Sequence, residues 1–331
     1  MHWVYRLLRK LRLVPLLASV LLGAGFGCAS HRPAPVVIER QATGAMVNNT
    51  GSDLNLHFVT FNIWGLPGWM TGAPGGRYPR IARELQRLDA DIVLLQEAWT
   101  AGARRAIPTN TQWAVARAAG QHTFFQQNGL VTLSKFPIVG GEFYPFTRGA
   151  FPDRIVNKGV LKVTVQLPDS RLVNIWNVHM QDGHATEVRA LQVRELIAHV
   201  QSAEDGQVAD LVGGDFNCTP DSELCQELIQ GLGPNLQQLS HAAPFVTWDG
   251  LWREGRAAMI DYIFVRERAV FQSLQASQHA AFKDQDLKQR LSDHLGIEAT
   301  VELGPCSNFA GPANPPAEGA QYHAVLARRA P

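Results

Sequence analysis

Between residues 54 and 303 the chain alternates short apolar runs, typical of strands, with stretches that have helical periodicity. Apolar residues recur on one face of 79–88 and of 187–201, and Thr219-Pro220 offers an N-cap and a first-turn proline for a third helix. Strands are predicted for residues 54–63, 91–96, 160–166, 172–178, 209–213, 259–265 and 295–303. Because strands and helices are interspersed throughout, the pattern predicts an α/β sandwich.

The two ends of the chain lack this periodicity. Residues 29–53 are rich in Pro, Ala, Asn, Thr and Gly, which predicts a flexible linker, and residues 304–331 are predicted to be a flexible tail. The folded body, 54–303, has about 250 residues and no obvious internal linker. We therefore expect one domain that acts as a monomer.

The first 28 residues have the pattern of a secretory signal peptide. Four cations lie within the first twelve residues, followed by an apolar run over 13–26 and then by small residues. The alternative is a transmembrane anchor, but the run is shorter than the roughly 18 to 20 residues that span a bilayer. Cys28, directly after Gly27, resembles the lipid-modified cysteine of a bacterial lipoprotein. The sequence thus predicts export, with the protein lipid-anchored on the cell envelope or secreted.

Composition narrows the class of protein. With 46% apolar and 18% charged residues, the chain can bury a core and is not of the disordered type. Residues 28–331 carry a net charge of −3, which disfavours binding of nucleic acid by bulk charge. Cys218 and Cys225 either form a disulfide or lie in the core as small apolar side chains.

Acids, amides and histidines recur at the ends of the predicted strands. A single Asn or Asp at such a position is commonly a turn former, but turns alone do not explain so many polar residues in the same positional pattern. The residues are Asn62, Glu97, Asn177, His179, Asp215, Asn217, Asp261, Asp293 and His294. This arrangement predicts a functional site at the strand ends.

The residue types in this set indicate phosphoryl chemistry with a hard metal ion. Oxygen ligands from Glu97, together with Asn62 or a second carboxylate, suit Mg²⁺, Mn²⁺ or Ca²⁺ rather than zinc. Such an ion, with histidines and amides nearby, suits water attack on a phosphate ester, because negative charge that develops there must be neutralised.

Six segments, in order, are similar to the endonuclease/exonuclease/phosphatase superfamily, which includes deoxyribonuclease I, inositol-polyphosphate 5-phosphatases and neutral sphingomyelinases. The segments are TFNIWGLP, DIVLLQEAW, NVHMQ, GGDFN, IDYIF and SDH. The resemblance covers about residues 54–303. It implies a four-layer α/β sandwich of two packed mixed β-sheets flanked by helices, and a metal-dependent hydrolase of phosphoric diesters.

The resemblance also implies a metal site and a set of ligands. Glu97 would be the main metal ligand, with Mg²⁺ as the ion and Mn²⁺ or Ca²⁺ as alternatives. Asn62 would lie beside it and orient water or phosphate, and Asp293 would support a second metal position or the adjacent site.

The remaining matched residues would handle protons and phosphate oxygens. His294 would be the general base or a phosphate ligand, and Asp261 would hold its ring in the useful tautomer. Asp215 would act as acid for the leaving oxygen or as base for the water. Asn217 and His179 would donate hydrogen bonds to the developing phosphorane.

Local patterns favour a sphingomyelinase-like phospholipase C. Trp64-Gly65-Leu66-Pro67, Lys158-Gly159 and the His179–Gln181 spacing resemble the neutral sphingomyelinase branch. Trp64 and Trp69 either contact a membrane surface or pack as ordinary core. The alternatives are an extracellular endonuclease (a deoxyribonuclease) on the same scaffold and a non-catalytic surface lipoprotein.

Overall fold

The computed structural model describes twelve segments of the chain. They are residues 33–42, 54–71, 76–108, 113–119, 128–151, 153–183, 185–203, 209–233, 246–249, 257–266, 276–281 and 290–303. The predicted signal peptide with Cys28 and the predicted tail lie outside these residues, so both stay predictions. Within the described segments, no helix has the length and apolar character needed to cross a bilayer.

Hydrogen bonds join the strands of the described chain into one twelve-stranded sheet. Its order is β10-β9-β8-β7-β6-β1-β4-β5-β3-β2-β12-β11. The strands are β1 (Ala34–Arg40), β2 (Leu54–Asn62), β3 (Ile92–Gln96), β4 (Ala114–Ala118), β5 (Val131–Ser134), β6 (Ile138–Pro145), β7 (Gly159–Gln166), β8 (Leu172–His179), β9 (Ala209–Asp215), β10 (Asp261–Arg266), β11 (Ala276–Ala281) and β12 (Gly296–Leu303). Parallel and antiparallel pairs both occur, so the sheet is mixed.

The two halves of this sheet pack against each other through a shared apolar core. Phe58 and Leu94, from one half, lie in the same buried cluster as Val163, Ile175 and Leu211 from the other half. Strand β1 joins the halves, because it pairs with β4 on one side and with β6 on the other. The expected pair of separate sheets is therefore one continuous sheet whose halves face each other.

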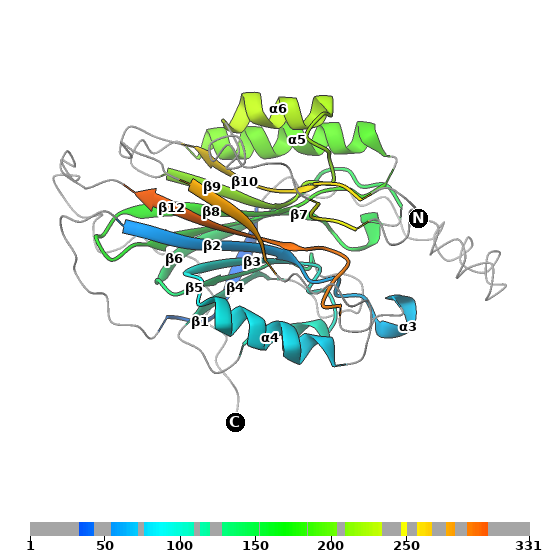
Figure 1. The fold of residues 1–331 in the computed structure, drawn as a ribbon. Helices are drawn as coiled ribbons and strands as arrows, with labels where there is room; N and C mark the ends of the chain where they lie inside the picture. The colour runs from blue at the N-terminus through cyan, green and yellow to red at the C-terminus, as the bar shows by residue number, and fades with distance from the viewer. Residues whose placement is uncertain are drawn as a thin grey trace.

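Helices cover the two outer faces (Figure 1). Helix α4 (Arg77–Leu88) places Ile81 and Leu85 on one half-sheet, and helices α5 (Thr186–Ser202) and α6 (Glu223–Leu232) cover the other. A short helix α3 (Gly68–Thr71) and two 3₁₀ turns, η1 (Ala103–Ala106) and η2 (Asp153–Ile155), lie in connecting loops. The predicted α/β class is confirmed.

Two local predictions were wrong. Residues 34–40 were expected to belong to a flexible linker but form β1, because their apolar side chains Val36 and Ile38 are buried in the shared core. Helix α6 begins at Glu223 rather than just after Thr219, because the Ser222 hydroxyl caps it by accepting a hydrogen bond from the Cys225 N–H.

Candidate active site

The strand ends that carry polar residues meet at one edge of the sheet. In the parallel pair β8–β9, His179 lies opposite Asp215, and in the parallel pair β2–β3, Asn62 lies opposite Gln96, which precedes Glu97. The antiparallel strand β10 begins at this edge, where Asp261 lies opposite Asp215. Parallel strands present their carboxyl ends together, so residues distant in sequence converge here.

Asn62 connects the ends of three strands. Its amide nitrogen donates to Glu97 Oε1 at 3.1 Å and to Asp215 Oδ2 at 3.0 Å, while its amide oxygen accepts from the Trp64 N–H at 3.0 Å. The side chain is fully buried. Asn62 thereby fixes the carboxylates of Glu97 and Asp215 relative to each other.

Glu97 is held in an unusual backbone conformation directly after β3. Its φ is 62°, in the left-handed region, and Gly129 packs closely against its Cα. Burial, with a smaller effect from the nearby Asp293 carboxylate, raises the pKa of Glu97 to about 8. Its Oε2 atom is buried and has no hydrogen-bond partner among the described residues. A buried carboxyl oxygen without a partner is what a hard cation would satisfy.

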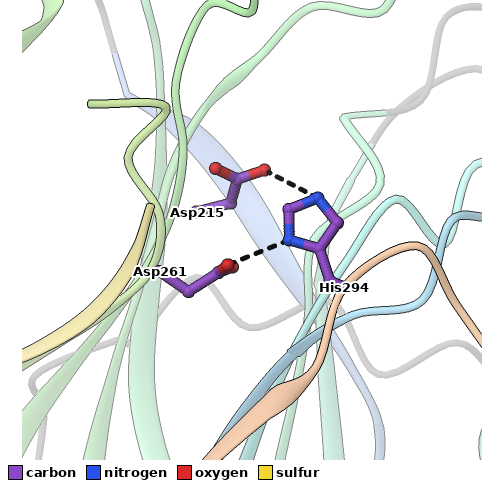
Figure 2. Close-up of side chains that lie close together, drawn as sticks. All are labelled: Asp215, Asp261 and His294. Carbon is purple, nitrogen blue, oxygen red and sulfur yellow. Dashed lines mark hydrogen bonds and ion pairs between the residues drawn. The ribbon is translucent and has the colours of Figure 1, made fainter. Parts of the chain in front are cut away.

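His294 lies between two carboxylates (Figure 2). Its Nδ1 is 2.9 Å from Asp261 Oδ2, and its Nε2 is 3.8 Å from Asp215 Oδ2. The first contact assigns the ring proton to Nδ1 and leaves Nε2 directed toward Asp215.

Protonation in this group is set by burial and by mutual charge. Burial alone would lower the pKa of His294, but the carboxylates of Asp261, Asp215 and Asp293 raise it well above its ordinary value. Burial, and then the Asp261 charge, raises the pKa of Asp215 to about 7. A carboxyl group whose pKa lies near neutral pH therefore faces a histidine whose protonated form is favoured, and such a pair suits acid–base catalysis.

His179 completes the cluster as a neutral ring. Its Nε2 is 3.8 Å from Glu97 Oε1 and 3.6 Å from Asp215 Oδ2, and the ring stacks on Trp99 with centroids 5.7 Å apart. Burial, followed by the positive charges of Lys158 and His294, lowers its pKa well below the ordinary value. A neutral imidazole here can donate a hydrogen bond to an anionic oxygen.

Asn217 and Asp293 lie beside this cluster. The Asn217 backbone N–H donates to Asp215 Oδ1 at 3.0 Å, and its side-chain amide donates to the Met180 carbonyl at 3.0 Å. Asp293 is buried, and burial raises its pKa although the neighbouring His294 acts in the opposite direction. The structure thus brings all eight predicted catalytic and metal residues to one edge of the sheet.

Arg77 was not predicted, and it connects two of the segments that carry the site. Its Nη1 donates to the Ile63 carbonyl at 2.6 Å and to the Leu291 carbonyl at 3.0 Å, and its Nη2 donates to the Trp64 carbonyl. Ser292 makes a second connection, because its hydroxyl donates to the Asn62 carbonyl at 2.7 Å. The segment after Asn62 is thereby fastened to the segment that leads into Asp293 and His294.

Lys158 is buried next to the site. Its ammonium is 2.7 Å from Asp153 Oδ2 and donates to the Met180 carbonyl at 2.8 Å, which also accepts from Asn217. The Lys158-Gly159 pattern resembles the neutral sphingomyelinase branch, but the sequence alone assigns Lys158 no role in the site. The contact places a buried positive charge within the network around His179.

The sequence also singled out Asn177, Trp64, Trp69 and the two cysteines Cys218 and Cys225. Asn177 is inside β8, where its amide donates to the Leu95 and Val131 carbonyls and ties the two half-sheets together. Trp64 is only 5% exposed, with Arg77 over its ring, so it packs as part of the core. The side chain of Trp69 lies outside the described part. Cys218 and Cys225 are buried free thiols.

Two sets of residues could hold a metal ion. Asp215, Asp261 and His294 each offer a ligand atom, and these atoms lie within 4.8 Å of one another. However, Asp261 already holds the His294 ring, so this set is better explained as a proton-transfer group. Glu97, with its orphaned oxygen, and the adjacent Asn62 amide fit a hard cation better.

The fold and the site define a known class of protein. The model of the Endonuclease/Exonuclease/phosphatase family matches residues 59–294, which is well over half of the chain. The chain therefore belongs to this family.

Individual relatives have low sequence identity to the chain. The chain is 28% identical over 193 residues to an inositol phosphosphingolipids phospholipase C from Schizosaccharomyces pombe, covering 54% of this chain and 44% of the relative. The chain thus spans less than half the length of that relative.

Solved structures share the fold. One is a Staphylococcus aureus beta toxin variant with bound magnesium ions, with a TM-score of 0.57, 20% identity, and coverage of 74% of this chain and 99% of the toxin. Another is D. rerio TDP2 complexed with a single-strand DNA product, with a TM-score of 0.60, 15% identity, and coverage of 75% and 98%.

Proposed function

We propose that the chain is a divalent-metal-dependent phosphodiesterase that hydrolyses a phospholipid in the manner of a sphingomyelinase-like phospholipase C. The observation that carries the proposal is the convergence of His294, Asp261 and Asp215 with Glu97 at one buried edge of the sheet. These groups can activate water on one side of a phosphate and neutralise charge on the other.

Glu97 and Asn62 would hold the metal ion, with Mg²⁺ as the expected ion and Asp293 supporting a second position. When bound, the cation would neutralise the negative charge of the phosphate group. The buried, unpartnered Glu97 Oε2 supports this assignment, because such an oxygen is costly to bury without a positive partner.

His294 and Asp215 would move the protons. Asp261 accepts a hydrogen bond from the Nδ1–H of His294 and so orients Nε2 toward the reacting centre. Neutralising Asp215 or Asp293 would lower the pKa of His294 toward the range in which the ring accepts a proton from water. Asp215, with a pKa of about 7, would supply or accept the second proton.

His179 and Asn217 would bind the phosphate oxygens. His179 is neutral and buried, so it donates a hydrogen bond without competing for the proton of the attacking water. Asn217 is held by the Met180 carbonyl, which fixes its amide beside Asp215.

The phospholipid substrate is supported by the phospholipase C name of the yeast relative and by the sphingomyelinase-like sequence patterns. A nuclease is the second candidate, because TDP2 with bound single-strand DNA shares the fold. The net charge of −3 for residues 28–331 disfavours it, since nucleic-acid binding relies on neutralising phosphates with cations.

A paired assay separates these two functions. The protein would be incubated with Mg²⁺ or with EDTA, on liposomes of sphingomyelin and phosphatidylcholine and on supercoiled plasmid. We expect phosphocholine release with Mg²⁺, loss of release with EDTA, and intact plasmid. Nicked plasmid together with no phosphocholine release from the liposomes would refute the lipid substrate.

Variants of the same protein test the assigned residues. His294→Ala and Glu97→Gln should each lose most of the Mg²⁺-dependent turnover while keeping the thermal unfolding transition. An exposed change on α4, Arg83→Met, is the matched control and should keep both. Wild-type turnover in His294→Ala would contradict the proposed proton transfer.

Export and lipid attachment at Cys28 are also proposed from the sequence. Mass spectrometry of the protein recovered from a bacterial host tests both, because cleavage before Cys28 and a diacylglyceryl adduct change the mass in distinct ways. An unprocessed N-terminus would contradict export through this signal.

A further inference from the structure

The loop that connects β6 to β7 exposes apolar side chains beside the active site. The structure describes its residues 147–151 and 153–157, which are called loop 147–157 below. Among the described residues, three large apolar side chains are exposed: Phe151 (43%), Ile155 (37%) and Val246 (41%). Two of them lie in this loop. Val246 directly precedes Thr247, whose hydroxyl accepts a hydrogen bond from the Asp261 N–H, so it also lies near the site.

The polar groups of the loop are fastened to the domain beneath it. The Thr147 N–H donates to Glu195 of α5, the Arg148 carbonyl accepts from Gln192 at 2.8 Å, and the Ala150 N–H donates to Gln181 at 2.7 Å. The first part of the loop is thus held to the domain by hydrogen bonds, and Phe151 and Ile155 stay at the surface despite the cost of exposing them.

The same loop is connected directly to the catalytic cluster. Asp153 pairs with Lys158 and accepts from Gln181 at 3.1 Å. Lys158 in turn donates to the Met180 carbonyl, next to His179 in the chain. A surface that binds this loop is therefore brought close to the reacting groups.

The charge of the loop favours an anionic surface. Arg148 and Arg154 are exposed; they lie three residues before and three residues after Phe151, and Arg154 directly precedes Ile155. Apolar side chains that enter a lipid interface, next to cations that meet lipid phosphates, are the combination that binds a bilayer surface containing anionic lipid.

We propose that loop 147–157 is a membrane contact surface, in which Phe151 and Ile155 enter the interfacial region of a phospholipid bilayer and Arg148 and Arg154 meet lipid phosphates. The proposal rests on the proposed function to the extent that the substrate is a membrane phospholipid. It moves the expected membrane contact from Trp64, which is buried, to the loop that carries Asp153, the partner of Lys158.

Vesicle sedimentation of the full chain in EDTA tests the contact without turnover. Binding would be measured to phosphatidylcholine vesicles with and without phosphatidylglycerol. The double variant Phe151→Ser/Ile155→Ser should bind at least about tenfold more weakly, because two apolar side chains no longer enter the lipid. The matched control, Phe151→Leu/Ile155→Leu, keeps the apolar character and should bind within about twofold of wild type.

Each other outcome overturns the proposal. Wild-type binding by the serine variant would show that the loop does not enter the bilayer, and equal weakening by both variants would show a packing role. Binding that depends only on phosphatidylglycerol, with no effect of either double variant, would assign the contact to charge alone.

Turnover separates this proposal from the proposed function. The serine variant should lose turnover on vesicles far more than on a soluble ester, bis(4-nitrophenyl) phosphate. If wild type hydrolyses neither substrate, the proposed function fails, and the sedimentation result still decides the membrane contact.

Discussion

Replacing Arg77 with Met should destabilise the protein by about 3 to 4 kcal/mol. The Arg77 side chain is 3% exposed and donates to three main-chain carbonyl groups and to the Tyr78 hydroxyl. A hydrogen bond from a charged donor contributes about 1.5 to 3 kcal/mol, and the contributions are not additive within one group. Relief of the cost of burying the guanidinium offsets part of the loss, so the expected loss of about 3 to 4 kcal/mol lies below the simple sum of the four bonds.

The assay is urea unfolding followed by tryptophan fluorescence, with the midpoint and the slope fitted separately. The matched control is Arg83→Met, the same chemical change at an exposed position of the same helix, which should stay within about 0.5 kcal/mol of wild type. Arg77→Lys should fall between the two, because one ammonium group cannot reach all the acceptors. A loss below about 1 kcal/mol in Arg77→Met, at unchanged slope, would refute the reasoning.

Arg77 also positions the site, so a kinetic effect should accompany the loss of stability. The folded Arg77→Met protein, assayed well below its unfolding midpoint, should show a kcat lower by about 10- to 100-fold with a smaller change in KM, because Asn62 and His294 are no longer fixed relative to each other. A rise in KM with unchanged kcat would instead indicate a role in substrate binding.

Three further predictions concern the site. Asp261→Asn should lower kcat by about a hundredfold or more with near-normal stability, because His294 loses the carboxylate that fixes its tautomer and stabilises its charge. Steady-state kinetics and thermal unfolding check this, and wild-type kcat would contradict it. The pKa values of Glu97 and Asp215, raised to about 8 and about 7, mean that the metal-free fold holds protons that the unfolded chain has released. Stability in EDTA should therefore carry a cost that grows as pH rises toward 8, and the increase in Tm caused by Mg²⁺ should grow over the same range; calorimetry at several pH values tests this, and a pH-independent Mg²⁺ effect would refute it. Gly129→Ala should lower both stability and turnover, because a Cβ there would lie 2.4 Å from the Trp99 ring at a φ of +73°. Gly140→Ala on β6 is the control, because a Cβ there would come no closer than 3.9 Å to Thr164.

The strands and residues of the site could be predicted because each has a local signal. An apolar run that ends in an acid, amide or histidine, as in LVGGDFN or DIVLLQE, reports both the strand and the chemistry at its end. Asn177 shows the limit of this signal, because its amide lies inside the strand and satisfies carbonyl groups of the facing half-sheet. The sequence does not distinguish these two uses of an Asn.

The connecting residues could not be predicted from local patterns. Arg77 lies in a helix whose other arginines include the exposed Arg83, and only its contacts with Ile63 and Leu291 distinguish it. Strand β1 was missed because its Pro- and Ala-rich surroundings are typical of a linker, while its pairing partners lie about eighty and a hundred residues further along the chain. Such roles depend on long-range pairing.

Strand β1 also limits how far a lipid anchor would let the domain move. Its first residue, Ala34, lies opposite Phe143, near the end of β6 from which loop 147–157 begins. A lipid on Cys28 would be separated from Ala34 by five residues, a reach of about 20 Å when fully extended. Such a short linker would raise the effective concentration of the active site at the membrane that holds the anchor, and would restrict the enzyme to lipids next to that anchor. A released form would therefore act on a different population of substrate from the anchored form.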